Sequence, residues 1–554
     1  MVRRVFNLMY REVRGLHQAA YILALFALGS QVLAIVRDRL LAHTFGAGIE
    51  LDLYYAAFRV PDLLFVLFAS VLSIYVLLPF VHRHTELNGV AAGTRVLSQV
   101  FTLFLVGYTA VAGLLAVVAP WYVPLLFPGL AAYSETLTML LRILLLQPFL
   151  LGLSTLCGVV TQMNHRFVLY AISPLLYNIG IIIGVAVLYP IVGLAGLGLG
   201  VVLGALGHLL VQVPFVRRSE FRFRVLREFE WGQIKEILQV SIPRALTMSI
   251  NQLVLLVLIG MATVMTAGSV SVFQFAFNLQ SVPLAVIGMS YSVAAFPTLS
   301  HLFASNDQRG FNQQLLTALR HIIFWSIPVI GLIIVLRAQL VRVLLGSGAF
   351  DWSDTRLTAA MLAIFVLSLT AQAALLLLVR AFYAGGRTFI PLVLASLSGA
   401  LTLTSAIFLQ SIYQTSPSFQ QFLQTAFRLS DVPGAEVLVL ALAFMAGQCL
   451  QLVLLLVWSA HTFQVRYRSL GRLTGQAMVA TLMGMLASYL TLRFVVEGIN
   501  QETFMGVLLQ GVTAGVIGVG VVVLVYWSTG ARELREISRS FKTRLFKTDV
   551  IAPQ

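Results

Sequence analysis

Eight charged residues interrupt stretches that are otherwise apolar, and these are the positions at which the chain could do chemistry. They are six arginines and two aspartates: Arg37, Arg39, Arg59, Arg142, Arg244, Arg320, Asp38 and Asp62. If the stretches cross a membrane, ionisable groups inside them are costly and mark a functional site by default. The alternative, open for Arg142, Arg244 and Arg320, is that a long side chain near a helix end reaches the membrane surface.

Five of the eight cluster in the first helical hairpin that the sequence predicts. Residues 37–39 lie about six residues before the end of the first helix, and Arg59 lies about six residues after the start of the second. At about 1.5 Å per residue, both positions are roughly 10 Å below the outer membrane face. Arg59 and Asp62 share a helix face. Pro61 between them interrupts the helical hydrogen bonds, which is tolerated where a membrane helix lines a cavity.

This charged hairpin allows two interpretations. In the first, Arg37 and Arg59 line a polar cavity and bind an anion, while Asp38 and Asp62 keep them ionised and oriented. Arginine suits phosphate because its planar fork donates hydrogen bonds in pairs and stays charged in a low dielectric. In the second, the charges neutralise one another in salt bridges that fix two helices. The residues by themselves leave both interpretations open.

The composition identifies the solvent as lipid. Of the 554 residues, 59% are apolar and 10% are charged, against about 45–50% and about 25% in soluble domains. A soluble chain needs a more polar exterior. A soluble enzyme, a nucleic-acid-binding protein and a disulfide-stapled module are therefore excluded, and the long apolar runs exclude an outer-membrane barrel. Cys157 and Cys449 both lie in apolar runs, so we expect no disulfide.

Fourteen stretches are long and apolar enough to be transmembrane helices, which need about 20 residues each. They are residues 17–43, 53–81, 96–120, 134–162, 167–189, 192–216, 236–265, 269–298, 313–336, 357–382, 388–411, 434–460, 473–496 and 503–528. We therefore expect an all-α polytopic membrane protein with about 14 transmembrane helices.

Basic residues indicate the orientation, because cytoplasmic loops carry an excess of lysine and arginine. With the N-terminus inside, the inner segments hold 25 of the 36 basic residues and the outer segments hold five. This segregation requires an even number of spans. We expect both termini to be cytoplasmic.

Helices 1–6 resemble helices 7–12 at an almost constant spacing. Landmarks are separated by 218, 221 and 217 residues, in the pairs Pro79 with Pro297, Arg166 with Arg387, and Pro174 with Pro391. Six helices per repeat give two six-helix lobes of one orientation, related by a parallel pseudo-two-fold axis. The expected domains are an amphipathic segment (1–16), two lobes (17–216 and 236–460), a basic linker (217–235), two C-terminal helices (473–528) and a basic tail (529–554).

The motifs of common enzymes are absent from the sequence. No P-loop, HExxH, CxxC or GxSxG occurs, so nothing indicates ATP hydrolysis, zinc binding or a serine nucleophile. No carboxylate cluster suits Mg²⁺ and polyprenyl-phosphate chemistry, and no filter-like repeat indicates a channel. We expect a protein that is not an enzyme and that has no cofactor and no metal.

Short motifs recur along the first eleven helices. The strongest is Phe45-Gly46-Ala47-Gly48, with Val36-Arg37-Asp38 before it and Asp52, Ala57-Phe58 and Pro61 after it. Others are Asn164-His165-Arg166-Phe167 with Pro174 and Asn178, the 345–351 segment LGSGAFD with Asp354-Thr355, and Arg380 with Phe382-Tyr383-Ala384 and Pro391. With these motifs the sequence resembles the MurJ (MviN) family of lipid II flippases. That family belongs to the multidrug/oligosaccharidyl-lipid/polysaccharide (MOP) exporter superfamily.

The resemblance implies a flippase that moves an undecaprenyl-diphosphate-linked disaccharide-pentapeptide from the inner to the outer leaflet by alternating access. Arg37, Asp38, Asp52 and Arg59 match, by position, a cationic cavity of the first lobe that is thought to hold the diphosphate. Asp62 joins this set of substrate-binding candidates through its place on the Arg59 face. The implied partners are the lipid-linked glycan, membrane lipids, and a coupling cation or the membrane potential, with no nucleic acid. A monomer in the bacterial cytoplasmic membrane is expected.

Several cavity positions depart from the family pattern. Arginines are usual where this chain has Gln31, Phe65, Val66 and Asn278, a glutamate where it has Ser70, and an aspartate near a proposed cation site where it has Arg387. Fewer arginines weaken the attraction for a diphosphate. Two alternatives therefore stay open. One is another exporter of the superfamily, acting as a drug/ion antiporter or a polysaccharide-lipid flippase, and the other is a membrane paralogue that does not transport.

Overall fold

The structure is a computed structural model that describes residues 16–221, 223–495 and 503–536. Within these ranges every regular element is a helix and no strand occurs. Most of the predicted amphipathic segment 1–16 and the end of the predicted basic tail lie outside the described residues. The chain divides into two compact units, residues 1–274 with 345–354, and residues 275–344 with 355–554.

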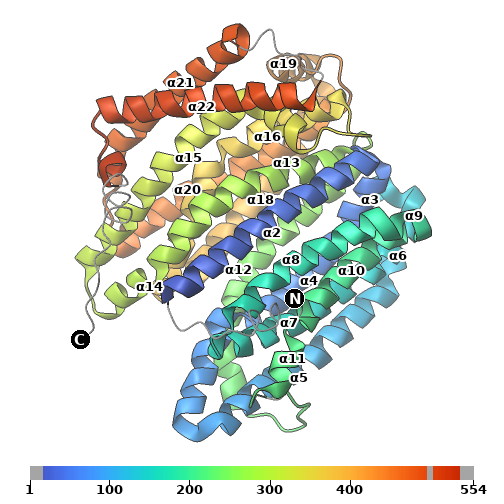
Figure 1. Cartoon of the computed structure of the whole chain (residues 1–554), viewed down its shortest axis with the longest axis vertical. Helices are drawn as coiled ribbons and strands as arrows, with labels where there is room; N and C mark the ends of the chain where they lie inside the picture. Colours follow the sequence, from blue (N-terminus) through green and yellow to red (C-terminus); the bar gives the residue numbers. More distant parts are fainter. Residues whose placement is uncertain (1–15, 222, 496–502, 537–554) are drawn as a thin grey trace, which may run out of the picture. The chain divides into compact units, whose positions relative to one another are not determined.

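The first unit contains the helices of the first half of the chain (Figure 1). They are α2 (Leu16–Phe45), α3 (Ile49–Ala57), α4 (Arg59–Val71), α5 (Ile74–Leu126), α6 (Ser134–Leu144), α7 (Leu146–Met163), α8 (Phe167–Ile183), α9 (Tyr189–Val192), α10 (Leu194–Leu210), α11 (Val213–Arg218), α12 (Trp231–Thr263) and the first turns of α13 (Ser269–Leu284). A 3₁₀ turn (Pro128–Tyr133) precedes α6, and a π-helical turn (Gly184–Leu188) follows α8.

The second unit contains the rest of α13 and the later helices. They are α14 (Ser290–Ala304), α15 (Gln308–Leu344), α16 (Trp352–Leu367), α17 (Leu369–Ala384), α18 (Phe389–Thr415), α19 (Pro417–Phe427), α20 (Leu438–Phe463), α21 (Leu470–Leu490) and α22 (Phe504–Ser528). Here α15 packs against α21 and α22, and α18 packs against α20. The helices α16 and α17 meet at a 45° bend.

Long apolar helices confirm the predicted class of an all-α polytopic membrane protein. Eleven helical segments of the described residues are long and apolar enough to cross a membrane, or twelve when the bent pair α16–α17 is counted as one span. The segment Ile49–Leu126 is counted once but has 78 residues. At about 1.5 Å per residue it is far longer than a bilayer of about 30 Å, so it holds two predicted spans. Together with α2, whose 30 residues cover the predicted span 17–43, these segments account for about 14 helices.

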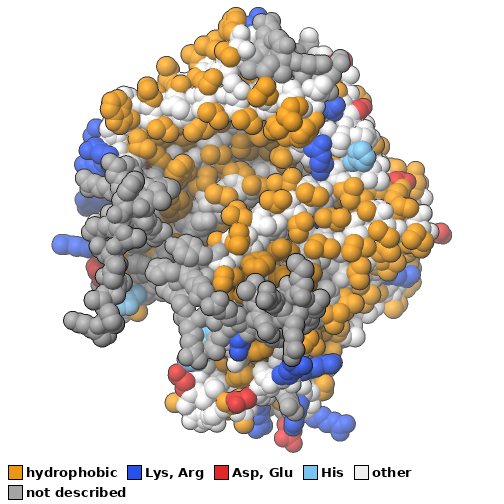
Figure 2. Space-filling model, in the orientation of Figure 1, with side chains coloured by type: hydrophobic (Ala, Val, Ile, Leu, Met, Phe, Trp, Pro, Cys, Tyr) orange, Lys and Arg blue, Asp and Glu red, His pale blue; other side chains and the backbone are white. Residues whose placement is uncertain are grey.

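The face of the first unit over α8 and α10 is covered mainly by hydrophobic side chains (Figure 2). Charged side chains gather instead toward the end where α5 and α11 lie. Many large apolar side chains are exposed, among them Trp121 at 77% and Leu203 at 42%. Exposed apolar surface of this extent is unstable in water and suits a helix bundle in lipid.

A line of glycines holds α8 directly against α10. A methyl group added at Gly180 would lie 2.2 Å from the Cα of Gly204, and one added at Gly200 would lie 2.3 Å from the Cα of Gly184. Small residues let membrane helices approach backbone to backbone. Since α8 also packs along α2, this contact sets the position of the α8 side chains that face α2 (Figure 1).

The first unit also includes α12, which packs along α4 and contacts α5. The limits of the unit thus differ from those of the lobe expected over 17–216. The lobes over 17–216 and 236–460, with their pseudo-two-fold axis, stay a prediction.

Candidate functional site

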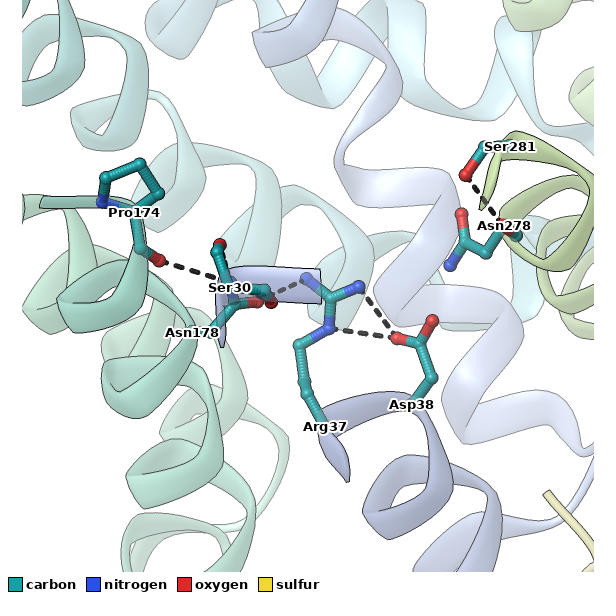
Figure 3. Close-up of polar contacts among 7 residues, drawn as sticks. All are labelled: Ser30, Arg37, Asp38, Pro174, Asn178, Asn278 and Ser281. Carbon is teal, nitrogen blue, oxygen red and sulfur yellow. Dashed lines mark hydrogen bonds and ion pairs between the residues drawn. The ribbon is translucent and has the colours of Figure 1, made fainter. Parts of the chain in front are cut away.

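Arg37 on α2 is the centre of a polar group inside the first unit. Its Nε donates to Oδ1 of Asp38 at 2.9 Å, and its Nη2 forms an ion pair with the same oxygen at 2.8 Å. Its Nη1 donates to Oδ1 of Asn178 on α8 at 3.1 Å. In Figure 3 the guanidinium lies between the two acceptors. Arg37 therefore joins α2 to α8 through one carboxylate and one neutral amide.

Neighbouring oxygens fix the orientation of the Asn178 amide. Its Nδ2 donates to the carbonyl of Pro174 at 3.1 Å and to Oγ of Ser30 at 3.2 Å. An amide that donates on one side must accept on the other. Asn178, which is 6% exposed, thus presents its Oδ1 to Arg37 (Figure 3).

The contacts of Arg37 leave part of its guanidinium available. An arginine side chain has five N–H donors, and three of those of Arg37 are occupied by Asp38 and Asn178. Among the described residues, the remaining N–H groups, one on each terminal nitrogen, have no partner. Two adjacent donors of this kind match a pair of phosphate oxygens.

Arg59 begins α4 because the helix is interrupted just before it. Pro61 has no N–H to donate to the carbonyl of Ala57, and α3 accordingly ends at Ala57 with Phe58 as a one-residue joint. The interruption expected from Pro61 is therefore present and lies on the N-terminal side of the proline. It places the Arg59 side chain in the interior, where the residue is 7% exposed.

Arg59 is a buried cation without an anionic partner among the described residues. Its Nη2 donates to Oε1 of Gln274, a neutral amide in the first turns of α13. Its Nε is buried and makes no hydrogen bond. A buried charge normally requires a counter-ion and complete hydrogen bonding. Within the described residues, Arg59 therefore has an unused buried N–H and no ion pair.

Asp62 does not form an ion pair with Arg59, although the two share a helix face. No carboxylate of the described residues lies within salt-bridge distance of Arg59. The ion pair of Arg37 is with its neighbour on the same helix. Among the described residues, neither Arg37 nor Arg59 links the two helices through a salt bridge, and both interpretations of the hairpin stay predictions.

Asp52 lies elsewhere, in α3 near the turn that follows α2. Its carboxylate is 2% exposed. It accepts from the backbone N–H of Gly268 at 2.7 Å, and from the N–H and hydroxyl of Ser271 at 2.8 and 2.6 Å. These donors belong to the start of α13, where free N–H groups and the helix dipole favour a negative charge. The geometry of Asp52 is that of a helix cap supplied by another helix.

The family motifs at 45–48 and 345–354 meet in space, which their sequence separation does not reveal. The N–H of Ala349 donates to the carbonyl of His43 at 2.9 Å. The N–H of Ala47 donates to Oδ2 of Asp354 at 3.1 Å. Gly46 has a φ of +60°, and a methyl group there would lie 2.6 Å from the carbonyl oxygen of Ala349. Glycine is thus required for this close approach.

Two arginines outside the hairpin have local structural roles. Arg142 is exposed, and its Nε donates to the carbonyl of Ala116 at 2.9 Å, an acceptor that Pro120 cannot fill because it has no N–H. Arg320 contacts Oε1 of Glu533 at 2.5 Å through Nη2 and at 2.6 Å through Nε. Glu533, at 3% side-chain exposure, is buried. Arg320 is therefore a half-buried residue whose charge is paired with a buried carboxylate.

Two positions where the family pattern has other residues make short hydrogen bonds within their own helices. The hydroxyl of Ser70 donates to the carbonyl of Val66 on its own helix at 2.9 Å. The carbonyl of Asn278 on α13 accepts from the hydroxyl of Ser281 at 2.6 Å (Figure 3).

The fold of the described residues defines a class of protein, a multi-pass helical membrane protein with the fold seen in solved transporter structures. A solved structure titled "Inward-facing conformation of a multidrug resistance MATE family transporter of the MOP superfamily" matches with a TM-score of 0.63 at 13% identity, covering 78% of this chain and 94% of that one. A solved structure of "Lipid II flippase MurJ, inward closed conformation" matches with a TM-score of 0.71 at 22% identity, covering 94% and 100%. At these identities the matches establish the fold.

The sequence identifies the family within that class. The profile of the family described as "Lipid II flippase MurJ" matches residues 41–417. A "Probable lipid II flippase MurJ" of Rhizobium tropici is 26% identical over 396 residues, which is 69% of this chain and 73% of the relative. The chain belongs to the lipid II flippase MurJ family, and the resemblance stated from its motifs is confirmed.

Proposed function

We propose that the chain carries a polyprenyl-diphosphate-linked peptidoglycan precursor of the lipid II type from the inner to the outer leaflet. Arg37 and Arg59 bind the phosphate groups. The observation that carries the proposal is Arg59, a buried guanidinium with a neutral partner and a buried Nε that makes no hydrogen bond. A phosphate oxygen would supply the missing acceptor and the missing charge.

The three aspartates of the hairpin, Asp38, Asp52 and Asp62, have different roles in this proposal. Asp38 holds the Nε edge of Arg37, so it orients this arginine while one N–H on each terminal nitrogen stays open. Asp62, one turn beyond Arg59, adds a negative charge to the same helix face without occupying the guanidinium. Asp52 acts through the start of α13, since its oxygens accept from Gly268 and Ser271.

Alternating access then requires the outer end of the first unit to open. With cytoplasmic termini, α2 runs outward, and the contacts of residues 43–52 with 268–271 and 345–354 lie at the outer side. The diphosphate could leave outward only after these contacts separate. Rocking of two six-helix lobes, driven by a coupling cation or the membrane potential, would provide that change. We place the protein as a monomer in the bacterial cytoplasmic membrane.

Reconstituted flipping of a fluorescent lipid II analogue tests the proposal. Arg37→Ala and Arg59→Ala should each abolish transport, because each removes a charged guanidinium that binds the phosphate groups. Lysine at either position should restore only part of the rate, since it supplies charge without the fork. Full activity of the Arg37→Ala/Arg59→Ala double variant would overturn the proposal.

A second candidate function follows from the departures at positions where the family usually has arginine. Gln31, Phe65, Val66 and Asn278 carry no charge, which favours an exporter for a different lipid-linked glycan with a less anionic head group. Complementation of a strain depleted of its lipid II flippase separates the two functions. Growth would support lipid II transport, and failure with normal expression would favour the second candidate or a paralogue that does not transport.

A further inference from the structure

The fixed orientation of the Asn178 amide is not explained by the binding roles proposed for Arg37 and Arg59. Its Nδ2 donates to the Pro174 carbonyl, the Ser30 hydroxyl and, at 3.5 Å, the Ser30 carbonyl, and its Oδ1 accepts from Arg37. The Pro174 and Ser30 oxygens therefore all face the same nitrogen (Figure 3). The acceptor side is therefore fixed toward Arg37 before any substrate arrives.

The chemical type of this acceptor matters because Arg37 already has a carboxylate partner. The single negative charge of Asp38 neutralises the single positive charge of Arg37. A carboxylate at position 178 would give one guanidinium two anions and make the group net negative. A neutral amide fixes the guanidinium as firmly without adding charge. In a buried site with a low effective dielectric, that single charge strongly changes the attraction for an anion.

We propose that Asn178 is a positioning residue for Arg37 and that its neutral amide sets the preference of the site for a diphosphate over a monophosphate. This inference rests on the proposed function. Asn178 holds Nη1 of Arg37 so that one N–H on each terminal nitrogen remains open as a phosphate-binding edge. With the neutral amide, Arg37, Asp38 and Asn178 together carry no excess negative charge. The affinity of the site therefore increases more for a diphosphate than for a less highly charged monophosphate.

The test compares binding of polyprenyl diphosphate and polyprenyl monophosphate to the full-length protein in nanodiscs. Asn178→Asp should bind diphosphate at least about tenfold more weakly, and its diphosphate-to-monophosphate affinity ratio should fall by a similar factor. A purely structural role would weaken both ligands equally and leave the ratio unchanged. An unchanged ratio in a folded Asn178→Asp variant overturns the inference.

Two controls make the result specific. Asn312→Asp makes the same change at an asparagine that donates to the Phe463 carbonyl at 2.9 Å, and it should leave the ratio unaltered. If Asn178→Asp does not fold, Asn178→Leu has nearly the same shape and removes the acceptor. It should raise the Kd for diphosphate several-fold, and an unchanged Kd would contradict the positioning role.

Arg37→Ala separates this inference from the proposed function. If Arg37→Ala loses diphosphate binding while Asn178→Asp binds as the wild type does, the inference about Asn178 alone fails. If Arg37→Ala binds diphosphate with wild-type affinity, the proposed function fails as well.

Discussion

Arg320 in the second unit and Arg59 in the first unit differ in the charge of their partners. In the second unit, Arg320 meets a buried carboxylate, Glu533, from the segment that follows α22. In the first unit, Arg59 is more deeply buried, at 7% exposed, but it meets a neutral amide and leaves its Nε without a hydrogen bond. A buried arginine whose charge is already balanced stabilises a structure. One whose charge is left unbalanced has the free energy of anion binding still available.

The largest expected difference between the two arginines is in stability. Arg320→Met leaves the Glu533 carboxylate buried without a counter-ion, which costs about 3 kcal/mol. Arg59→Met removes a charge that has no anionic partner, so stability should stay the same or rise. Thermal unfolding midpoints in detergent check this, with a fall of several degrees expected only for Arg320→Met.

A double variant serves as the control for this comparison. Replacing both members of the pair, as in Arg320→Met/Glu533→Leu, should return stability close to that of the wild type, because apolar side chains can replace a buried ion pair. Equal destabilisation by Arg59→Met and Arg320→Met would show that the two regions do not differ in the way described.

An intermediate effect is expected at the two aspartates of the hairpin. Asp52→Asn removes the charge at the start of α13 and one of its acceptor oxygens, which should cost about 1–2 kcal/mol. Asp62→Asn is the matched control, since Asp62 makes no ion pair among the described residues, and its stability should change little. Unfolding midpoints of both variants provide the measurement, and the reverse order would refute the capping role of Asp52.

The smallest effect is expected for a third arginine pair, on the exposed surface of the second unit. Both terminal nitrogens of Arg356 donate to Asp431 at 2.7 Å. This contact holds the pKa of Asp431 below its usual range. A lowered folded-state pKa adds stability above the unfolded pKa of about 3.9, and that stability is lost as the pH falls through the folded value.

The measurement for this pair is the unfolding midpoint between pH 6 and pH 3, compared with that of Asp431→Asn. The wild type should lose its small advantage over the variant only at the acidic end, since exposed pairs contribute little. An advantage that grew toward low pH would contradict the assignment.

Much of the architecture follows from sequence because lipid imposes a simple rule. Each span needs about 20 apolar residues, so helices such as α18 and α20 can be placed by counting. The depth of Arg37 and Arg59 also follows from counting, since helical rise is constant. Pro61 predicts the helix interruption before Arg59, because its missing N–H affects a backbone hydrogen bond only four residues away.

The partners of these charges could not be found in the same way. Asn178 is 141 residues from Arg37, and Gln274 is 215 residues from Arg59. Such pairs depend on how neighbouring helices are rotated, which neither hydropathy nor charge reports. The pairing of Arg320 with Glu533 was missed for the same reason. The family motif that contains Asn178 marks the residue as a candidate. Its contact with α2 cannot be predicted from the sequence, because it depends on how the helices pack.

The glycine contact between α8 and α10 has a mechanical consequence. Two backbones that touch without side chains between them cannot slide or separate without opening a gap that neither helix can fill. The pair α8–α10 should therefore move as one stiff element, carrying Asn178 with it. Any widening around Arg37 has to come from bending or tilting of α2, the partner that is held to α8 by larger and more adaptable side chains.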